Sequence, residues 1–408
     1  MKVEKNVLII AGVFFPEPVV SSKILFDLAT ELSVKHNVTV LRPKPTRPMG
    51  FEIPFYDVSK LTFKVIELNS YTHPKSTLIG RMYESFSMGV HSVEFIKKNV
   101  KNIDLIYNAP WQLVGRYMVA KIANKFDIPF IIPVQDVYPE SIISKLPNWF
   151  PFKKIIISLL LPYDKLALLY STKVHTISEK IKEYLIATRG VDKDKFLVVQ
   201  NWQNEEDFIK FKSQNISIKS DLKTPFIFMY LGNIGPLAGI EILVEAFISA
   251  AISNSILIIA GSGSAKESLI DKFKDYIPHT IKFLDVPDGK VPETQFIADV
   301  MVLTIKKGFS STSVPSKLPA YMFSSKPIIV SVDKNSDTAQ SILDSGCGWV
   351  CESENVDMLA KSMMQAALTD ETELNQMGYS GYQYALNNFS RKNNLRKLLK
   401  ACEDVLAL

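Results

Sequence analysis

Hydroxyl and lysine side chains are concentrated in residues 310–327, SSTSVPSKLPAYMFSSKP, between two apolar runs that predict strands. The segment contains Thr312, Ser313, Ser316 and Lys317 but no carboxylate. We expect a helix to begin near Lys317, where free backbone amides favour an anion. The pattern indicates that hydroxyls and one cation bind a phosphate, and the alternative is a solvated lysine at a helix start.

Two glycine turns follow predicted strands in the second half of the chain. SILIIAGSGSAKESL contains Gly261, Ser262 and Gly263, and YLGNIGPLAGIEIL contains Gly232 and Gly235. Such turns let backbone amides approach a phosphate, and loops at the carboxyl ends of parallel strands converge on one crevice. The alternative is a tight turn in which glycine serves only packing, because the complete dinucleotide fingerprint is absent.

Two carboxylates lie near the tip of a predicted strand in the first half. In PVQDVYPES, Asp136 and Glu140 are candidates for acid-base work or for orienting a hydroxyl. The alternative is that Asp136 and Ser141 cap the next helix, with Glu140 in its first turn. Both interpretations stay open on the sequence.

An aromatic and basic segment precedes a long apolar run. LPNWFPFKKIIISLLLPYDKL places Trp149, Phe150 and Phe152 beside Lys153 and Lys154. A helix of this composition suits a membrane interface. A core helix with a solvated start is the alternative, and it is favoured because apolar stripes usually face a core.

Metal chemistry is not indicated. The five histidines offer no pair at ligand spacing, and His73, a candidate on the acceptor side, reads better as a loop residue than as a base. Cys347 and Cys351 lie four apart without a neighbouring histidine, and Cys402 stands alone. We expect three buried thiols in a reducing compartment.

Length and charge narrow the class of protein. A chain of 408 residues suggests two domains, and a net charge of +5 suits an anionic ligand or membrane surface better than nucleic-acid wrapping. The first apolar run reads as a strand rather than a signal peptide, and no run reaches the length of a membrane span. We expect a cytoplasmic protein, or one docked on the inner face of the cytoplasmic membrane without crossing it, and no nucleic-acid partner.

Strands and helices alternate along the whole chain. Runs such as NVLIIAGVFF, SSKILFDLATELSVKH and NVTVL form one βαβ unit, and the pattern recurs in both halves. This rhythm predicts an α/β protein of two doubly wound, Rossmann-like domains with a cleft between them. We place the domains at residues 1–204 and 205–385, and expect residues 386–408 to form a helix that packs back towards the first.

The ordered motifs resemble glycosyltransferase family 4, the retaining nucleotide-sugar transferases of GT-B fold, and within it the branch of bacterial capsule and O-antigen clusters. They are FFPEP, QDVYPES, HTISEKIKEYL with VVQNW, GNIGPLAGIEILVEAF, IIAGSGS, VPSKLPAYMFSSKPII and GCGWVCESENVDMLAKSM. The resemblance implies that the second domain holds a nucleoside diphosphate sugar as donor substrate, with no further cofactor and no metal. It implies that the first domain holds a glycan or polyprenyl-diphosphate-linked acceptor.

The chain departs from the family pattern at charged positions of the donor side. The resemblance implies a pair of glutamates where Thr312 and Ala320 stand, and an arginine and a lysine where Asn233 and Ala238 stand. Two carboxylates and two cations are therefore missing together. We expect Lys317 to replace the cations, with the hydroxyls of the same segment contacting phosphate or ribose, and Lys306 and Lys307 in reserve.

The acceptor side departs as well. The family's glycine-rich loop after the first strand appears here as PEPVVSSKI, with Ser21, Ser22 and Lys23 in place of glycines. We expect this bulkier loop to alter the choice of substrate.

Three alternatives to a transferase remain. A nucleotide-sugar epimerase of the same fold would need several cleft acids and histidines, which are few here. An inactive, partner-binding subunit is favoured by the missing glutamates but not by Asp136, Glu140 and Lys317. A nicotinamide oxidoreductase is least supported, because neither half has the full glycine fingerprint.

Overall fold

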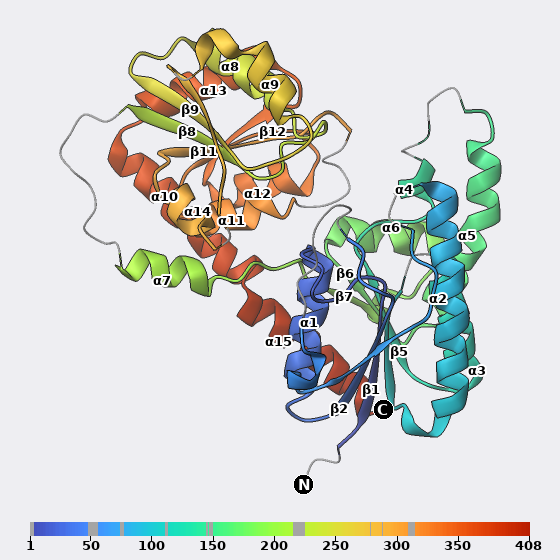
Figure 1. The fold of residues 1–408 in the computed structure, drawn as a ribbon. Helices are drawn as coiled ribbons and strands as arrows, with labels where there is room; N and C mark the ends of the chain where they lie inside the picture. The colour runs from blue at the N-terminus through green and yellow to red at the C-terminus, as the bar shows by residue number, and fades with distance from the viewer. Residues whose placement is uncertain are drawn as a thin grey trace. The chain divides into compact units, whose positions relative to one another are not determined.

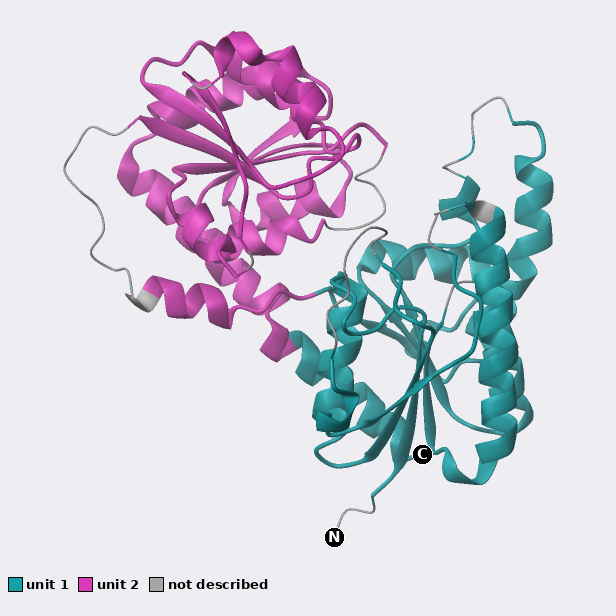
Figure 2. Cartoon of the chain, in the orientation of Figure 1, with its two compact units in different colours: residues 1–201, 394–408 teal, residues 202–393 magenta. Residues whose placement is uncertain are grey.

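The computed structural model divides the chain into two compact units, residues 1–201 with 394–408 (unit 1) and residues 202–393 (unit 2) (Figure 2). The sequence places the corresponding boundaries at 204 and 385. The residues that the structure describes are 4–47, 56–73, 77–110, 113–143, 146, 150–214, 225–277, 279–287, 289–308 and 315–408.

Unit 1 is a seven-stranded parallel sheet covered on both faces, in the order β3-β2-β1-β4-β5-β6-β7. The strands are β1 Asn6–Ala11, β2 Asn37–Arg42, β3 Lys64–Glu67, β4 Leu105–Ala109, β5 Phe130–Val134, β6 Lys173–Thr176 and β7 Phe196–Val198. The helices are α1 Val20–Leu32, α2 Leu78–Asn99, α3 Val114–Lys125, α4 Glu140–Ile143, α5 Lys153–Tyr170, α6 Glu179–Arg189 and α15 Arg391–Leu406.

The central strands of unit 1 are continuous apolar runs because both of their faces are buried. β5, for example, is buried at all five positions. Helices α2, α3 and α5 pack in sequence on one face, and α1 lies on the other (Figure 1). The strand order reverses between β1 and β4, and ligands of doubly wound folds bind at the carboxyl ends of strands at such a switch point.

Unit 2 repeats this architecture with six parallel strands in the order β10-β9-β8-β11-β12-β13. The strands are β8 Phe226–Leu231, β9 Ser255–Ala260, β10 Ile281–Leu284, β11 Val300–Thr304, β12 Ile328–Val332 and β13 Gly348–Glu352. The helices are α7 Glu206–Gln214, α8 Ile240–Ala250, α9 Lys266–Lys272, α10 Val291–Phe296, α11 Lys317–Phe323, α12 Asp337–Ser345, α13 Val356–Leu368 and α14 Glu371–Asn388.

Two apolar clusters fill the two faces of the second sheet. One joins the sheet to α8, α9 and α13, and the other joins it to α11, α12 and α14. The order reverses between β8 and β11, so the second switch point lies between these strands. The predicted α/β fold of two doubly wound domains is therefore confirmed.

The last helix, α15, belongs to unit 1 from Asn394 onwards. It buries Leu395, Leu398 and Cys402 among other side chains, and a carboxylate oxygen of Glu403 lies 3.2 Å from Nε2 of His36, within hydrogen-bond distance. Unit 1 is thus built from two segments separated by almost two hundred residues of sequence.

Candidate active site

Three loops are joined at the switch point of unit 2. In the loop after β8, the amide of Ile234 donates to the carbonyl of Ser262 at 2.8 Å, and its carbonyl accepts from the Ala265 amide at 3.0 Å. In the loop after β11, the amide of Lys306 donates to the carbonyl of Leu237 at 3.1 Å. The predicted glycine turns therefore do converge on one edge of the sheet.

The side chain of Lys317 lies against the turn after β8. Its Nζ is 4.5 Å from the centroid of the Tyr230 ring, bonds the Tyr230 hydroxyl, and lies 3.5 Å from the carbonyl oxygen of Asn233. Gly232 has φ +152°, and a Cβ there would be 2.3 Å from Cε of Lys317. Glycine is thus favoured at 232, because L residues rarely adopt this φ and because an added Cβ would displace the lysine stem.

The surroundings of Lys317 perturb its charge. Burial lowers the pKa of the Lys317 ammonium from 10.5 to about 8, and burial raises the pKa of the Tyr230 phenol. The tyrosine hydroxyl donates to the Asn233 carbonyl at 2.7 Å, which leaves its oxygen free to accept from the lysine. No carboxylate pairs with Lys317 among the described residues. A desolvated cation without a counter-anion is a candidate anion site.

The other predicted donor residues surround this lysine to different degrees. Gly261 packs so closely on Gly232 that a Cβ would be 2.2 Å from the Gly232 carbonyl oxygen, and a Cβ on Gly263 would be 2.3 Å from the Ile234 carbonyl oxygen. Ser262 and Asn233 are exposed at the same edge, and Gly235 is half-buried beside them.

Helix α11 begins where the sequence predicts it, at Lys317. Ser316 occupies its N-cap position and is exposed, but its side chain makes no capping hydrogen bond. Ala320, where the resemblance implies a glutamate, is buried in the core. Thr312 and Ser313 lie outside the described residues.

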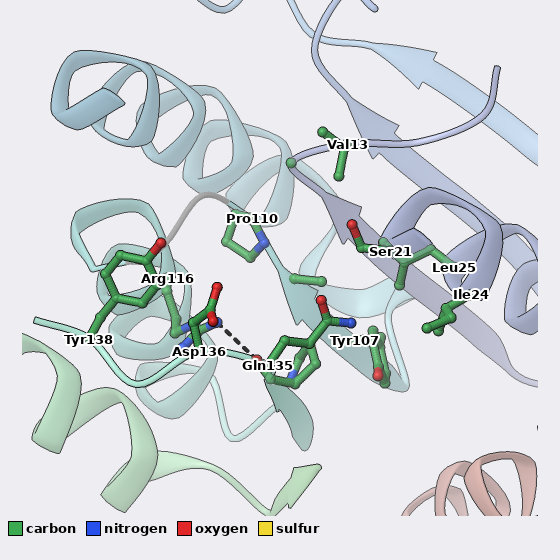
Figure 3. Close-up of a pocket in the computed structure, with 13 residues that line it drawn as sticks. Val13, Ser21, Ile24, Leu25, Tyr107, Pro110, Arg116, Gln135, Asp136 and Tyr138 are labelled. Carbon is green, nitrogen blue, oxygen red and sulfur yellow. Dashed lines mark hydrogen bonds between the residues drawn. The ribbon is translucent and has the colours of Figure 1, made fainter. Parts of the chain in front are cut away.

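A cavity of about 200 Å³ lies at the switch point of unit 1 (Figure 3). The residues that follow β1, β4 and β5 form its walls, together with the start of α1. Its lining includes Ser21, Tyr107, Arg116, Gln135, Asp136 and Tyr138. Asp136 is half-buried there, so the structure brings this predicted carboxylate to a cavity at the carboxyl edge of the sheet.

The wall of this cavity includes a buried guanidinium. Arg116 is 1% exposed, and its Nη2 donates to the carbonyl of Pro133 at 2.9 Å, whereas Nε and Nη1 have no hydrogen-bond partner among the described residues. Burial lowers the pKa of Arg116, while the charges of Asp164 and Asp136 raise it. Asp136 therefore shares the cavity with a guanidinium whose Nε and Nη1 lack hydrogen-bond partners among the described residues.

Tyr107 forms another part of the wall, and its ring lies below the labelled polar groups in Figure 3. Its hydroxyl is 2.9 Å from Nδ1 of His175, whose Nε2 is 2.9 Å from the Val199 carbonyl. Burial lowers the pKa of His175 to about 4, so the imidazole is neutral at pH 7. Because only Nε2 can then donate to the carbonyl, the tyrosine hydroxyl donates to Nδ1.

Glu140 is engaged in a buried charge network. Its two carboxylate oxygens accept from Nη1 and Nη2 of Arg189 at 2.8 and 2.7 Å, and Tyr184 donates to it at 2.9 Å. Arg189 also bonds Asp164, which is 3% exposed. Burial raises the pKa of Glu140, but the hydrogen bonds from Arg189 hold it below its ordinary value overall. This geometry gives Glu140 a structural task, and a catalytic role for it stays a prediction.

The three predicted residues of α1 differ in environment. Ser21 lines the cavity of unit 1, Ser22 is buried at 1% exposure, and Lys23 is exposed. All three lie in the first turn of the helix, whose N-cap, Val19, provides no side-chain bond. Of the three, Ser21 is the one that lines the same cavity as Asp136.

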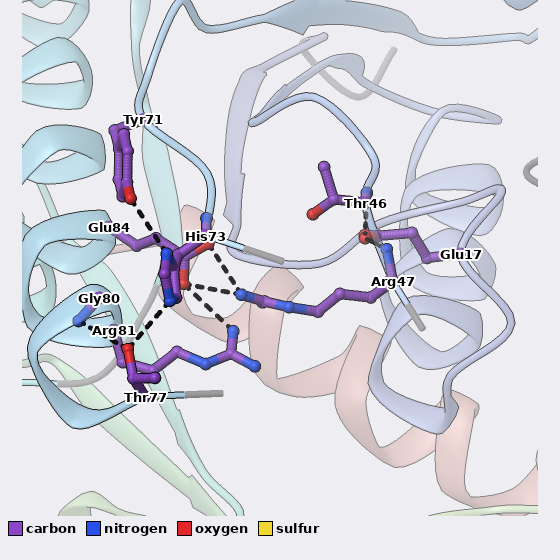
Figure 4. A network of polar contacts seen from close by, with 9 residues as sticks. All are labelled: Glu17, Thr46, Arg47, Tyr71, His73, Thr77, Gly80, Arg81 and Glu84. Atoms are coloured by element: carbon purple, nitrogen blue, oxygen red, sulfur yellow. Dashed lines mark hydrogen bonds and ion pairs between the residues drawn. The ribbon is translucent and has the colours of Figure 1, made fainter. Parts of the chain in front are cut away.

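His73 belongs to a different polar network, which joins the loops after β2 and β3 to the first turns of α2 (Figure 4). Its ring nitrogens lie 3.0 Å from the Tyr71 hydroxyl and 2.9 Å from the Thr77 hydroxyl, and its amide donates to Glu84 at 2.6 Å. Glu84 in turn accepts from Arg47 at 2.7 Å. With both nitrogens engaged, His73 fits a loop-fixing role, and an acceptor-side role stays a prediction.

Two residues of the sites were missed from the sequence. Tyr230 is the one polar-tipped residue in the run FIFMYL, and Arg116 shares a helix face with Val119, Ala120 and Ala123. Burying a hydroxyl at the end of a strand, or a cation in an apolar stripe, costs free energy unless the group has a hydrogen-bond partner or a counter-charge. These two polar residues in apolar runs were the features of the sequence that could have indicated the sites.

Metal ligands are not assembled in the part of the chain that the structure describes, where no group of three or more His, Cys, Asp or Glu side chains could hold an ion. The three cysteines are free and buried, as expected. Among the described residues, no helix combines the length and apolar character needed to cross a bilayer.

Two family models together span most of the chain. Residues 22–206 match the model described as Glycosyltransferase Family 4, and residues 212–384 match Glycosyl transferases group 1. The chain belongs to glycosyltransferase family 4. The first match lies almost entirely in unit 1 and ends at residue 206, and the second lies within unit 2.

Known relatives agree with this assignment. A probable glycosyltransferase of Pseudomonas aeruginosa, WbjE, is 22% identical over 68% of this chain and 69% of its own length. A glycosyltransferase from Rickettsia africae aligns over 99% of both chains with 17% identity and a TM-score of 0.68. Anabaena HepE, solved with UDP, aligns over 98% of this chain and 100% of its own with 13% identity and a TM-score of 0.67. The fold is therefore GT-B.

Proposed function

We propose that this glycosyltransferase moves a hexosyl group, with retention of configuration, from a nucleoside diphosphate sugar to a lipid-linked glycan in the synthesis of a bacterial surface polysaccharide. HepE is solved with UDP and UDP-glucose, and another similar structure, WaaG, acts in lipopolysaccharide biosynthesis. These names favour a UDP-sugar donor and a surface glycan as product.

The observation that carries the proposal is Lys317 at the switch point of unit 2. The reaction breaks the bond between the anomeric carbon and the diphosphate oxygen, so negative charge develops on the leaving diphosphate. A desolvated ammonium held against Gly232 and Tyr230 supplies the compensating charge where the family's usual arginine and lysine positions hold Asn233 and Ala238. Lys317, at the start of α11, thus takes the place of two side chains from the loop after β8.

Asp136 is the carboxylate that we assign to the acceptor. It lines the cavity of unit 1 together with Ser21 and Arg116. In this proposal Asp136 accepts a hydrogen bond from the attacking hydroxyl and orients its lone pair towards the anomeric carbon. Retention and independence from metal are parts of the proposal that follow from family membership.

A two-step measurement tests the proposal. UDP, GDP, ADP and their glucose conjugates are compared by thermal shift, because a ligand that binds only the native state raises Tm with the logarithm of its concentration. Transfer of radiolabelled sugar from the binding donor to a polyprenyl-diphosphate-linked saccharide is then followed, with the product's anomeric configuration read by NMR. Absence of stabilisation by all of these nucleotides overturns the proposal, and binding without transfer favours a non-catalytic subunit.

A further inference from the structure

Helix α5 begins outside the hydrophobic core. Its only buried side chains are Asp164, Ala167 and Leu168, so the eleven residues 153–163 contain none. The core-helix interpretation of this segment therefore holds only for its last turns. A half-exposed apolar helix end is unusual because most helical stability comes from burying the apolar face.

The exposed apolar side chains of α5 share one face. Phe152, Ile155, Leu159 and Tyr163 are 55%, 55%, 65% and 41% exposed, and they are spaced by three, four and four residues. This spacing repeats the helical period, so they form one stripe along the helix.

The charged residues that adjoin this stripe in the sequence have one sign. Lys153 and Lys154 stand in the first turn, and the sequence from Leu146 to Tyr163 contains no acid. The next carboxylate, Asp164, is buried and bonded to Arg189. The start of α5 is thus apolar and cationic, which is the composition of an interfacial helix.

The first turns of α2 carry a second apolar stripe. Ile79, Met82, Tyr83, Phe86 and Val90 are all exposed and follow the same helical spacing. Helices α2 and α5 both follow strands of a parallel sheet, so both begin beyond the carboxyl edge where the cavity of unit 1 opens (Figure 1).

We propose that these two stripes, with Lys153 and Lys154, form a docking surface for an anionic lipid bilayer. The lysines decide between occupants: a second copy of the chain would bring like charges together, whereas an anionic bilayer neutralises them and accepts the apolar side chains. The inference rests on the proposed function, because a lipid-linked acceptor presents its glycan at a bilayer surface next to the cavity edge.

Vesicle sedimentation tests the docking surface. The full chain is mixed with vesicles of phosphatidylcholine alone or of equimolar phosphatidylcholine and phosphatidylglycerol, and its partition coefficient is measured. The wild type is expected to bind the anionic vesicles more tightly, and less so at high salt. Ile155→Ser/Leu159→Ser is expected to lower this coefficient at least about tenfold, because two apolar side chains no longer enter the interface.

A matched control comes from unit 2. Leu343 and Leu368 are 63% and 87% exposed, so Leu343→Ser/Leu368→Ser changes a similar apolar area away from the proposed surface and leaves vesicle binding unchanged. Lys153→Gln/Lys154→Gln is expected to reduce binding to anionic vesicles roughly fivefold per lysine and to leave neutral vesicles unaffected. Circular dichroism confirms that each variant folds.

Three results would overturn the docking surface. They are no sedimentation of the wild type with anionic vesicles, equal losses in the two serine variants, and conversion of a dimer to a monomer by Ile155→Ser/Leu159→Ser in light scattering with vesicle binding retained. UDP binding is measured on the same samples without lipid. UDP binding without vesicle binding counts against the surface alone, and the reverse counts against the proposed donor.

Discussion

Replacing Lys317 by methionine should stabilise the free protein and weaken nucleotide binding at the same time. Methionine keeps the unbranched stem that packs on Gly232 and removes the charge. The pKa of Lys317 is lowered from 10.5 to about 8 by burial, so the native state resists protonation of this lysine more than the unfolded chain does.

The magnitude follows from linkage. Between about pH 8 and 10.5 the unfolded chain binds more protons than the native state, so stability rises with pH across that window. At pH 7 the buried charge lowers the free energy of unfolding by up to roughly 3 kcal/mol, and at pH 9.5 by less than half of that. Lys317→Met should raise the free energy of unfolding by about the amount lost at pH 7, and by less at pH 9.5, as measured by urea unfolding.

Nucleotide binding should change in the opposite direction. Loss of one charge-assisted contact to the diphosphate costs about 1–3 kcal/mol, which is a roughly 5- to 150-fold rise in the Kd for UDP by calorimetry. Only the protonated lysine binds well, so wild-type affinity should fall about tenfold from pH 7 to pH 9 while the variant's affinity stays flat.

Lys361→Met, at an exposed position of α13, is the control and should change neither quantity. The reasoning is refuted if Lys317→Met binds UDP as the wild type does, or if it is less stable than the wild type at pH 7.

Asp136→Asn should lower kcat by about 10²- to 10⁴-fold with an unchanged Kd for UDP, since the acceptor carboxylate lies in the other unit from Lys317; a changed Kd with normal kcat would contradict its assignment. Arg189→Met should destabilise the fold by about 3–5 kcal/mol in urea titrations, because it leaves buried Asp164 uncompensated. Glu140→Gln should weaken the loss of stability at acid pH. The lowered pKa of Glu140 gives the wild type stability that is present above its ordinary pKa of 4.5 and is lost as the pH falls through the folded pKa. An unchanged pH dependence in acid unfolding would contradict the pairing with Arg189. Gly232→Ala should displace Lys317 and raise the Kd for UDP by a similar factor to Lys317→Met, whereas Gly346→Ala, at a helix C-cap with open space around it, should leave binding intact.

The doubly wound architecture was predictable because its signal is local. Each buried strand and each amphipathic helix can be recognised from the pattern of about ten residues, and the parallel order of the strands follows from their alternation with helices. The glycine turns were found for the same reason. The boundary near residue 386 was harder to place from the sequence. Helix α14 continues to Asn388, and α15 begins at Arg391, before the chain returns to unit 1 at Asn394.

The partners within each site were not predictable, because they come from distant segments. Nothing near Lys317 in sequence indicates Tyr230, eighty-seven residues earlier, and nothing near Glu140 indicates Arg189. Whether a carboxylate is free for chemistry or occupied by an ion pair depends on such contacts. Asp136 and Glu140 looked equivalent in the motif, and the fold separates them.

The division of unit 1 between two distant segments has a consequence for biosynthesis. Residues 1–201 leave the ribosome without α15, so the sites that receive Leu398 and Cys402 stay uncovered until all of unit 2 has been translated. Unit 2 is contiguous in sequence. Near its two ends, the Glu205 carboxylate accepts hydrogen bonds from the Ser390 hydroxyl and from the amides of Arg391 and Lys392. Nascent chains should therefore complete their second module first, and chaperones should meet the first module as an unfinished, sticky intermediate.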